Sequence, residues 1–241
     1  MSSATVQFFS DALGKWTQYN LLLPDSGETP FPVLMQLHGL SDDRNAWVQR
    51  FNFLRHVERY PMVVVLPDGG TSGYLNWKVS DRLHKRRYED LLMTDIPAHL
   101  ARQFNISDGP WAIGGLSMGG YGAVRLGLKY PDRFCSIWGH SSAFVIDKMV
   151  DPALIEDAED ANPFRHAETL VRREECPVIS FDCGVDDKLI DHNRRFHAHL
   201  DALGIDHHYA EHAGGHTWQY YRPHIHPVAS YTASEIAEMA A

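Results

Sequence analysis

The segment with the clearest capacity for chemistry is Gly115-Leu116-Ser117-Met118-Gly119, in which a serine lies between two glycines. The apolar residues 111–116 predict a buried strand before Ser117, and residues 121–130 predict a helix after it. A serine at such a junction lies on a tight turn, and the flanking glycines let strand and helix approach without a Cβ clash. The turn exposes the hydroxyl beside the helix N-terminus, so we predict Ser117 as a nucleophile. The alternative is a glycine-rich turn without chemistry.

A serine hydroxyl needs a general base, and several histidines follow Ser117 in or near the last predicted strand. His207 and His208 lie within that strand, where a ring cannot readily turn toward the serine, and His212 lies near its end. His216 follows two glycines in the next loop, which gives its ring the freedom to reach the hydroxyl. Position therefore favours His216 over His212 as the base.

The base in turn needs a carboxylate that orients its ring, and in this type of fold the acid lies between serine and histidine in the chain. Three aspartates near a predicted strand end meet that order: Asp182, Asp186 and Asp187. Asp182 closes the strand, whereas the other two lie in the loop after it. Position alone leaves the choice among them open.

Acyl transfer also needs two hydrogen-bond donors for the oxygen that becomes negatively charged. One candidate is the backbone N–H of Met118, the residue after the predicted nucleophile. The other is expected from the turn His38-Gly39-Leu40, which follows the predicted strand at residues 33–37. Gly39 permits a sharp turn that leaves the Leu40 amide free to point inward. The alternative for this turn is an ordinary connection from strand to loop.

Several residues on loops at the expected site could contact the substrate. The aromatic candidates are Trp47, Tyr74, Trp77 and Trp218, and His38 and Gly39 are candidates beside the predicted oxyanion donor. Each aromatic side chain could equally fill the core or anchor a loop.

The composition argues against several other classes of protein. The 241 residues carry 22 Lys+Arg and 31 Asp+Glu, and this net charge of −9 argues against binding to nucleic acid or anionic membranes. No apolar run is long enough to cross a bilayer, no secretory signal is visible, and three cysteines do not make a disulfide framework. We therefore predict a cytoplasmic protein and, if it is a homo-oligomer, nothing larger than a dimer.

Histidine is frequent, with 15 residues that concentrate in the C-terminal half. None of them forms a His-Glu-x-x-His motif, and no Cys-x-x-Cys occurs. Most are therefore predicted to lie on the surface or in hydrogen bonds, and no metal site is predicted. Metal-dependent hydrolysis by the histidine cluster is the alternative.

Short apolar runs alternate with helical patterns along most of the chain. Strands are predicted at residues 5–9, 16–23, 33–37, 62–66, 111–116, 134–139, 177–182 and 205–211, and helices at 48–59, 88–104, 121–130, 192–203 and from 217 onward. This order is typical of a parallel sheet with helices on both faces and a site at the carboxyl ends of the strands. Residues 144–175 fit no strand and are rich in acidic side chains, so we expect an insertion or cap within a single domain of residues 1–241.

Six short motifs follow one another along the chain: Leu37-His38-Gly39, Leu66-Pro67-Asp68-Gly69, Tyr88-Glu89-Asp90, Gly115-Leu116-Ser117-Met118-Gly119-Gly120, Cys183-Gly184-Val185-Asp186-Asp187 and Gly215-His216-Thr217-Trp218. In this order they resemble the esterase D, or putative esterase, family of α/β-hydrolases. The family includes tributyrin-type carboxylesterases, S-formylglutathione hydrolases and feruloyl esterases. The resemblance covers nearly the whole chain and implies an α/β-hydrolase fold.

The resemblance also implies roles for individual residues. The family's Gly-x-x-Asp pattern implies that the acid is Asp187, three residues after Gly184, and its Gly-His-x-Trp pattern implies His216 as the base. The amides of Leu40 and Met118 are expected to bind the oxyanion.

The activity that the resemblance implies is that of a serine carboxylesterase, which hydrolyses small short-chain acyl esters through an acyl-enzyme intermediate and needs no cofactor. At the first oxyanion turn, the sequence of S-formylglutathione hydrolases resembles Ser-Gly-Leu, whereas this chain has His38-Gly39-Leu40. S-formylglutathione hydrolase, or another acyl thioesterase or acyltransferase, is therefore the alternative. A non-catalytic binding protein on the same fold is an alternative of another class.

Overall fold

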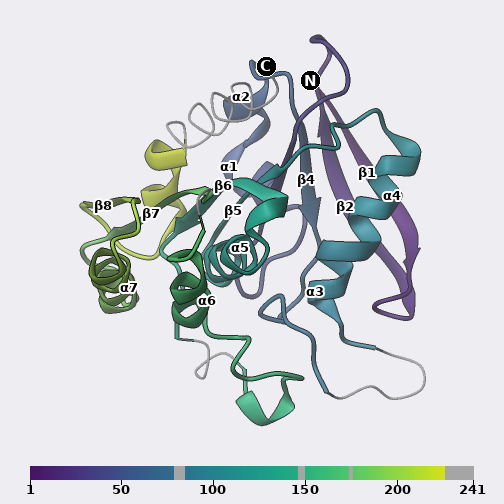
Figure 1. Ribbon diagram of the computed structural model, residues 1–241. Helices are drawn as coiled ribbons and strands as arrows, with labels where there is room; N and C mark the ends of the chain where they lie inside the picture. Colours follow the sequence, from purple (N-terminus) through teal and green to yellow (C-terminus); the bar gives the residue numbers. More distant parts are fainter. Residues whose placement is uncertain (79–84, 146–149, 174–175, 226–241) are drawn as a thin grey trace.

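The computed structural model describes residues 1–78, 85–145, 150–173 and 176–225, and its centre is an eight-stranded sheet (Figure 1). The strands are β1 (Ser2–Ser10), β2 (Lys15–Leu23), β3 (Val33–Leu37), β4 (Val63–Pro67), β5 (Trp111–Leu116), β6 (Phe134–His140), β7 (Val178–Gly184) and β8 (His208–His212). Their order is β1-β2-β4-β3-β5-β6-β7-β8, in which β1 and β2 pair antiparallel and β2 pairs antiparallel with β4. All other neighbours are parallel, so the predicted mostly parallel sheet is confirmed.

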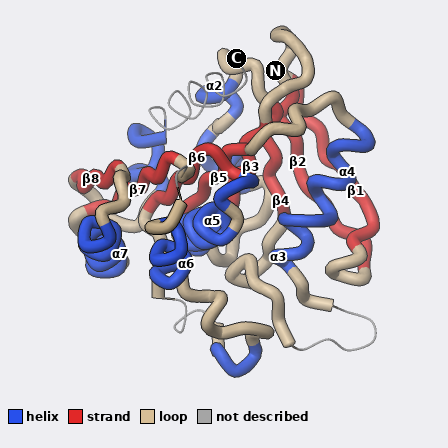
Figure 2. Tube along the Cα trace, in the orientation of Figure 1, coloured by secondary structure: helices blue, strands red, loops and turns tan. Residues whose placement is uncertain are grey.

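Helices cover both faces of this sheet (Figure 2). The α-helices are α1 (Ala46–Phe51), α2 (Leu54–Val57), α3 (Tyr88–Asp90), α4 (Ile96–Gln103), α5 (Met118–Lys129), α6 (Pro163–Leu170) and α7 (Ile190–Leu203), and residues 218–225 are also helical. One face packs against α4, α5, α6 and α7, and the other packs against α1, α2 and residues 218–225. Within the described ranges, no helix is both long enough and apolar enough to cross a bilayer.

The central strands are apolar throughout because they contribute to a core on each face. In β4, Val63 and Val65 pack on the side of α5, while Val64 and Leu66 pack on the side of α1. Successive side chains of a strand point to opposite faces, so a strand covered on both faces has no solvent-facing position. This is why the sequence shows uninterrupted apolar runs here rather than an alternation of apolar and polar residues.

The predicted helix at residues 48–59 is two short helices, α1 and α2. Asn52 ends α1 in the left-handed conformation, with φ 55°, and its N–H donates to the carbonyl of Val48 at 3.1 Å. Asparagine adopts this conformation more readily than most residues and so can end a helix. The apolar spacing continues through the break, which is why it predicted one helix.

The predicted helix at residues 88–104 also has an internal irregularity, a π-helical turn at Leu91–Asp95 between α3 and α4. Pro97 has no N–H and cannot donate to the carbonyl of Met93, four residues earlier. The guanidinium of Arg133 donates to that carbonyl instead, at 2.6 Å. The helix therefore continues past Pro97, with a wider turn before it.

The last strand is shorter than predicted, because residues 205–207 form the connection between α7 and β8. Gly204 is left-handed, with φ 68°, and closes α7. The N–H of Ile205 then donates back to the carbonyl of Leu200 at 3.0 Å. Pairing with β7 begins only at His208.

Residues 144–175 contain α6, which forms the crossover between the parallel strands β6 and β7 and packs against α5. Before α6, Ile155 pairs with Trp77 through an isolated β-bridge, and the carbonyl of Ala161 accepts a hydrogen bond from the Tyr121 hydroxyl at 2.6 Å. The segment is thus attached by its own contacts to α5 and to the loop that contains Trp77. That it forms a cap over the site stays a prediction.

A buried ionic network joins α3 and α5 to this segment. Arg125 is fully buried and lies 2.7 Å from Glu89 and 3.3 Å from Asp160. Lys129 pairs with both acids, and the Tyr130 hydroxyl donates to Glu89 at 2.6 Å. Burial by itself would raise the pKa of Glu89, but Arg125, Lys129 and Tyr130 lower that pKa to about 2.

Replacing Glu89 by Gln should lower the free energy of unfolding by about 3 kcal/mol at pH 7, because it leaves Arg125 buried with a weaker partner. The pKa of Glu89 is lower in the folded protein than in the unfolded chain, where it is near 4.5. Its contribution is therefore complete above pH 4.5 and is lost as the pH falls toward 2. Urea unfolding at several pH values should show the gap between the two proteins narrowing in acid.

The matched control is Glu28→Gln, which removes an exposed carboxylate and should change stability by less than about 0.5 kcal/mol. A stability gap for Glu89→Gln that is as large at pH 3 as at pH 7 would contradict the role given to this network.

Candidate active site

Ser117 occupies the turn between β5 and α5 in a conformation that is rare for a residue with a side chain, with φ 56° and ψ −115°. Its N–H donates to the carbonyl of His140 at 2.8 Å. Its carbonyl accepts from the N–H groups of Tyr121 at 3.0 Å and Ala143 at 3.2 Å. The turn is therefore held from both sides, which is how a strained backbone persists in a folded protein.

The two glycines of the motif are required by backbone contacts. A Cβ on Gly115 would lie 2.4 Å from the backbone of Gly119. A Cβ on Gly119 would lie 2.4 Å from the carbonyl oxygen of Leu37 and 2.6 Å from that of His38. Strand, turn and helix can meet at this distance only without side chains at these positions, as the sequence predicted.

His216 lies between Ser117 and Asp187 and contacts both. Its Nε2 is 3.0 Å from the Ser117 hydroxyl, and its Nδ1 is 2.8 Å from Oδ2 of Asp187. An ionised carboxylate only accepts hydrogen bonds, so Nδ1 carries the proton and the lone pair of Nε2 faces the serine. Of the candidate histidines, the structure therefore brings His216 to the serine.

Asp187 is the aspartate of the three candidates that contacts His216. It is buried, and its Oδ1 accepts the N–H of Leu189 at 2.8 Å. Burial alone would raise its pKa, but hydrogen bonds from His216, Leu189 and Ser141 hold that pKa below its usual range. Asp187 is thus an ionised carboxylate. Its neighbour Asp186 is exposed.

Asp182 has different partners, which the sequence did not indicate. Its two carboxylate oxygens contact Nδ1 of His140 at 2.5 Å and the Tyr220 hydroxyl at 2.6 Å. Burial would raise the pKa of Asp182, but His140 and Tyr220 keep it below its usual value. Because the His140 carbonyl accepts the N–H of Ser117, this buried group lies directly behind the serine turn.

The predicted oxyanion turn is oriented by the ring of His38. The Gly69 N–H donates to Nε2 of this ring at 2.9 Å, so the proton is on Nδ1, which donates to the Gly39 carbonyl at 2.8 Å. In a trans peptide the carbonyl and the next N–H point in opposite directions. The N–H of Leu40 therefore points away from His38.

The second predicted donor, Met118, is the first residue of α5. The first N–H groups of a helix have no carbonyl partner within it and form the positive end of its dipole. The same end of α5 contacts the predicted oxyanion turn, since Gly119 packs against the His38 carbonyl. The Tyr74 hydroxyl donates to that carbonyl at 2.8 Å.

Most of the predicted pocket aromatics instead hold loops in place. Trp47 is fully buried and donates to the Leu37 carbonyl at 3.1 Å, and Trp77 is buried and donates to the Ser72 carbonyl at 2.9 Å. Both rings thus have a structural role, and a contact of Trp47 or Trp77 with the substrate stays a prediction. Trp218 is half-buried and packs edge-on against Trp47 at 5.5 Å.

Two exposed apolar side chains lie on the loops of the site. Leu40 is 43% exposed and Val185 is 45% exposed. Leu40 belongs to the predicted oxyanion turn, and Val185 lies two residues before Asp187. The sequence analysis did not single out Val185, and only its exposure distinguishes it.

Among the residues that the structure describes, one group of three side chains could hold a metal ion, and it includes neither Ser117 nor His216. The residues around the serine offer one imidazole, one carboxylate and one hydroxyl in a chain of hydrogen bonds. This arrangement can move a proton from the hydroxyl to the imidazole and so generate a nucleophile.

Known proteins share both the sequence pattern and the fold. A family model described as "Putative esterase" matches residues 10–230 of this chain. An acetyl esterase from Caldicellulosiruptor saccharolyticus is 29% identical, over 93% of this chain and 96% of its own length.

Two solved structures are similar over nearly their whole length. FphF, a fluorophosphonate-binding serine hydrolase from Staphylococcus aureus, has a TM-score of 0.86 at 21% identity and covers 96% of this chain and 98% of its own. An S-formylglutathione hydrolase from Agrobacterium tumefaciens has a TM-score of 0.84 at 18% identity and covers 97% of this chain and 95% of its own. These similarities confirm the predicted α/β-hydrolase fold.

Gly119→Ala should destabilise the protein by about 1–3 kcal/mol or more, because the new Cβ would overlap two backbone carbonyl oxygens that cannot turn away. Thermal unfolding measures the effect. Gly109→Ala is the matched control, since its Cβ would meet only the Ser107 hydroxyl, at 3.2 Å. Equal Tm values for the two variants would mean that the contact between the turns is not as close as described.

Proposed function

Because this chain belongs to the putative esterase family and is a serine carboxylesterase, we propose that Ser117 is its nucleophile, His216 its general base and Asp187 the acid. The proposed reaction is hydrolysis of small, short-chain acyl esters. The observation that carries the assignment is the unbroken hydrogen-bond chain from the Ser117 hydroxyl through both nitrogens of His216 to the carboxylate.

In the first half of the proposed reaction, His216 Nε2 takes the proton of the Ser117 hydroxyl while the oxygen attacks the ester carbonyl. The charged imidazolium forms between the serine and the Asp187 carboxylate, which stabilises it and fixes the tautomer. The imidazolium then gives its proton to the departing alkoxide, and an acyl ester on Ser117 results. Water then attacks the acyl ester by the same steps and releases the carboxylic acid product.

The N–H groups of Leu40 and Met118 are the proposed donors to the oxyanion. His38 supports one of them as a positioning residue, since its Nδ1–H holds the Gly39 carbonyl and so turns the Leu40 N–H the other way. The positive end of α5 supports the other. The proposed steps use only side chains, backbone amides and water.

Short acyl groups are supported by the relative named acetyl esterase. The exposed Leu40 and Val185 offer a small apolar surface on the loops of the site. Cys135, Cys176 and Cys183 form no disulfide within the described residues, which is in keeping with a reducing compartment, so the cytoplasm is the proposed location.

S-formylglutathione hydrolase is the second candidate, because a solved structure of that activity has a TM-score of 0.84 with this chain. Both reactions pass through the same acyl-serine and differ in the leaving group, which is a thiolate rather than an alkoxide. Comparison of S-formylglutathione with an acetate ester as substrate, at equal enzyme concentration, separates them by kcat/KM.

Hydrolysis of p-nitrophenyl esters should be fastest for acetate and butyrate and should fall toward decanoate. Ser117→Ala should lose activity roughly 10⁴-fold or more, because the nucleophile is removed. A fluorophosphonate probe should label the unmodified protein and not the variant. Equal hydrolysis by both proteins, or no labelling and no hydrolysis of any ester, would contradict the role of Ser117 and favour the binding-protein alternative.

Asp187→Asn should lower kcat roughly 10³–10⁴-fold, because an amide cannot stabilise the imidazolium and permits the wrong tautomer of His216. Asp186→Asn is the matched control, since this neighbouring carboxylate is exposed, and its activity should stay close to that of the unmodified protein. The measurement is the rate of p-nitrophenyl acetate hydrolysis. The reverse pattern would assign the acid to Asp186.

A further inference from the structure

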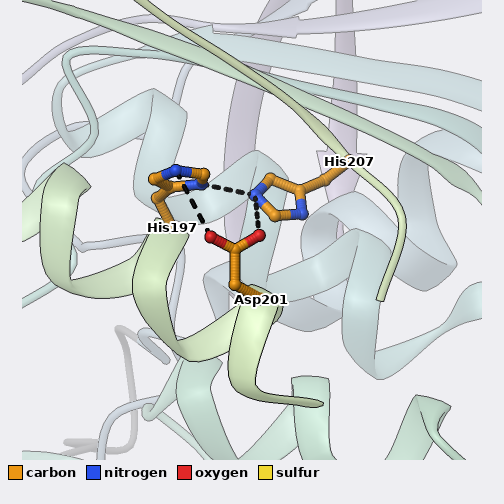
Figure 3. Close-up of side chains that lie close together, drawn as sticks. All are labelled: His197, Asp201 and His207. Carbon is orange, nitrogen blue, oxygen red and sulfur yellow. Dashed lines mark hydrogen bonds and ion pairs between the residues drawn. The ribbon is translucent and has the colours of Figure 1, made fainter. Parts of the chain in front are cut away.

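Three side chains with no part in the proposed ester hydrolysis come together at one edge of the sheet: His197, Asp201 and His207 (Figure 3). His197 and Asp201 lie one turn apart on α7, and His207 lies in the segment between α7 and β8. One possible ligand atom from each residue lies within 4.8 Å of the others. Among the described residues, no other such group of three occurs.

His207 has the tautomer and the second contact that are typical of a metal-bound histidine. Its side chain is only 4% exposed, and its Nδ1 lies 2.8 Å from the carbonyl of Ile205. A carbonyl only accepts, so Nδ1 carries the proton and Nε2 has a free lone pair. A carbonyl behind the distal nitrogen orients metal-binding histidines in the same way.

The lone pair of His207 faces the other two side chains. His197 Nδ1 lies 2.7 Å from His207 Nε2, and Asp201 Oδ1 lies 3.9 Å from it (Figure 3). The other carboxylate oxygen of Asp201 lies 3.5 Å from Nε2 of His197. Two ring nitrogens with one proton between them, beside a carboxylate, can exchange that proton for a cation.

Packing fixes the rings but leaves the carboxylate free to adjust. His207 stacks on Phe181 with ring centroids 5.7 Å apart, and His197 packs on Tyr209 at 4.7 Å. The side chain of Asp201 is 61% exposed. Two nitrogens on one tetrahedral Zn²⁺ are separated by about 3.3–3.4 Å, given Zn–N distances of about 2.0–2.1 Å, so the two ring nitrogens, now 2.7 Å apart, need to part by about 0.6–0.7 Å.

We propose that His197, Asp201 and His207 bind a divalent first-row transition-metal cation such as Zn²⁺, with water in the remaining position. Two imidazoles and one carboxylate favour this class over Mg²⁺ and Ca²⁺, which prefer oxygen ligands. The cation joins the last turns of α7 to the segment that enters β8. Asp187 precedes α7 and His216 follows β8, so the candidate active site lies at the opposite ends of these two elements. The expected effect of the cation is therefore on stability.

The test is titration of Zn²⁺ into full-length protein that has been treated with chelator and desalted, by isothermal titration calorimetry and thermal unfolding. One Zn²⁺ per chain is expected to bind, with a Tm that rises with Zn²⁺ concentration. Asp201→Asn and His207→Gln should weaken the affinity roughly 10–100-fold or more. Asp201 is exposed, so its variant remains informative even if the His207 variant does not fold.

The matched controls are Asp206→Asn and His208→Gln, which alter the two exposed residues on either side of His207 in the chain and should keep the affinity. Absence of saturable binding to the unmodified protein would overturn the proposal. Equal affinity in the Asp201 and control variants would do so too, because it would indicate binding by other surface histidines. Neither readout depends on ester hydrolysis, so the outcome is independent of the proposed function.

Discussion

The hydrogen bond from the N–H of Ser117 to the carbonyl of His140 joins the strained turn to the neighbouring strand, and the rest of the site depends on it. A side chain at φ 56° costs of the order of 1–3 kcal/mol, so other contacts must fix this turn. The carbonyl of Ser117 is held by Tyr121 and Ala143, and Gly119 packs the turn against the predicted oxyanion turn at residues 38–40. The backbone of Ser117 is therefore fixed, and the other residues of the site are placed around it.

Asp187 and His216 follow the ends of β7 and β8. The buried group of Asp182, His140 and Tyr220 holds these ends together. Asp182 accepts from Tyr220 in the helix that follows His216, and it pairs with His140 on the strand whose carbonyl holds the serine turn. Asp187, five residues later, contacts His216 itself. Asp182 thus joins the strand ends to the last helix, and Asp187 contacts the proposed base. Both are buried, and the contacts with their partners hold the pKa of each below its usual value.

The sequence predicted what depends on local pattern and missed what depends on distant contacts. Apolar runs located the strands, and glycine spacing singled out Ser117 and His216, which the structure brings within 3.0 Å of each other. The choice of Asp187 over Asp186 rested on family resemblance, because two adjacent loop residues differ only in which one turns inward. The pairing of Glu89 with Arg125 joins residues far apart in the chain and left no local signal.

The abundance of histidine gave no indication of what each ring does, yet the structure separates three of them by one rule. In His38, His207 and His216 the Nδ1 faces an oxygen that only accepts, so each ring carries its proton there and leaves a lone pair on Nε2.

The partner of the Nε2 lone pair then decides the role of each ring. In His38 it accepts from an amide N–H that cannot give up its proton, so the ring is a fixed support. In His207 it faces a second imidazole, which a cation can replace as the partner. Only in His216 does it face a hydroxyl, that of Ser117, and a base is useful only where its partner can lose a proton and then react.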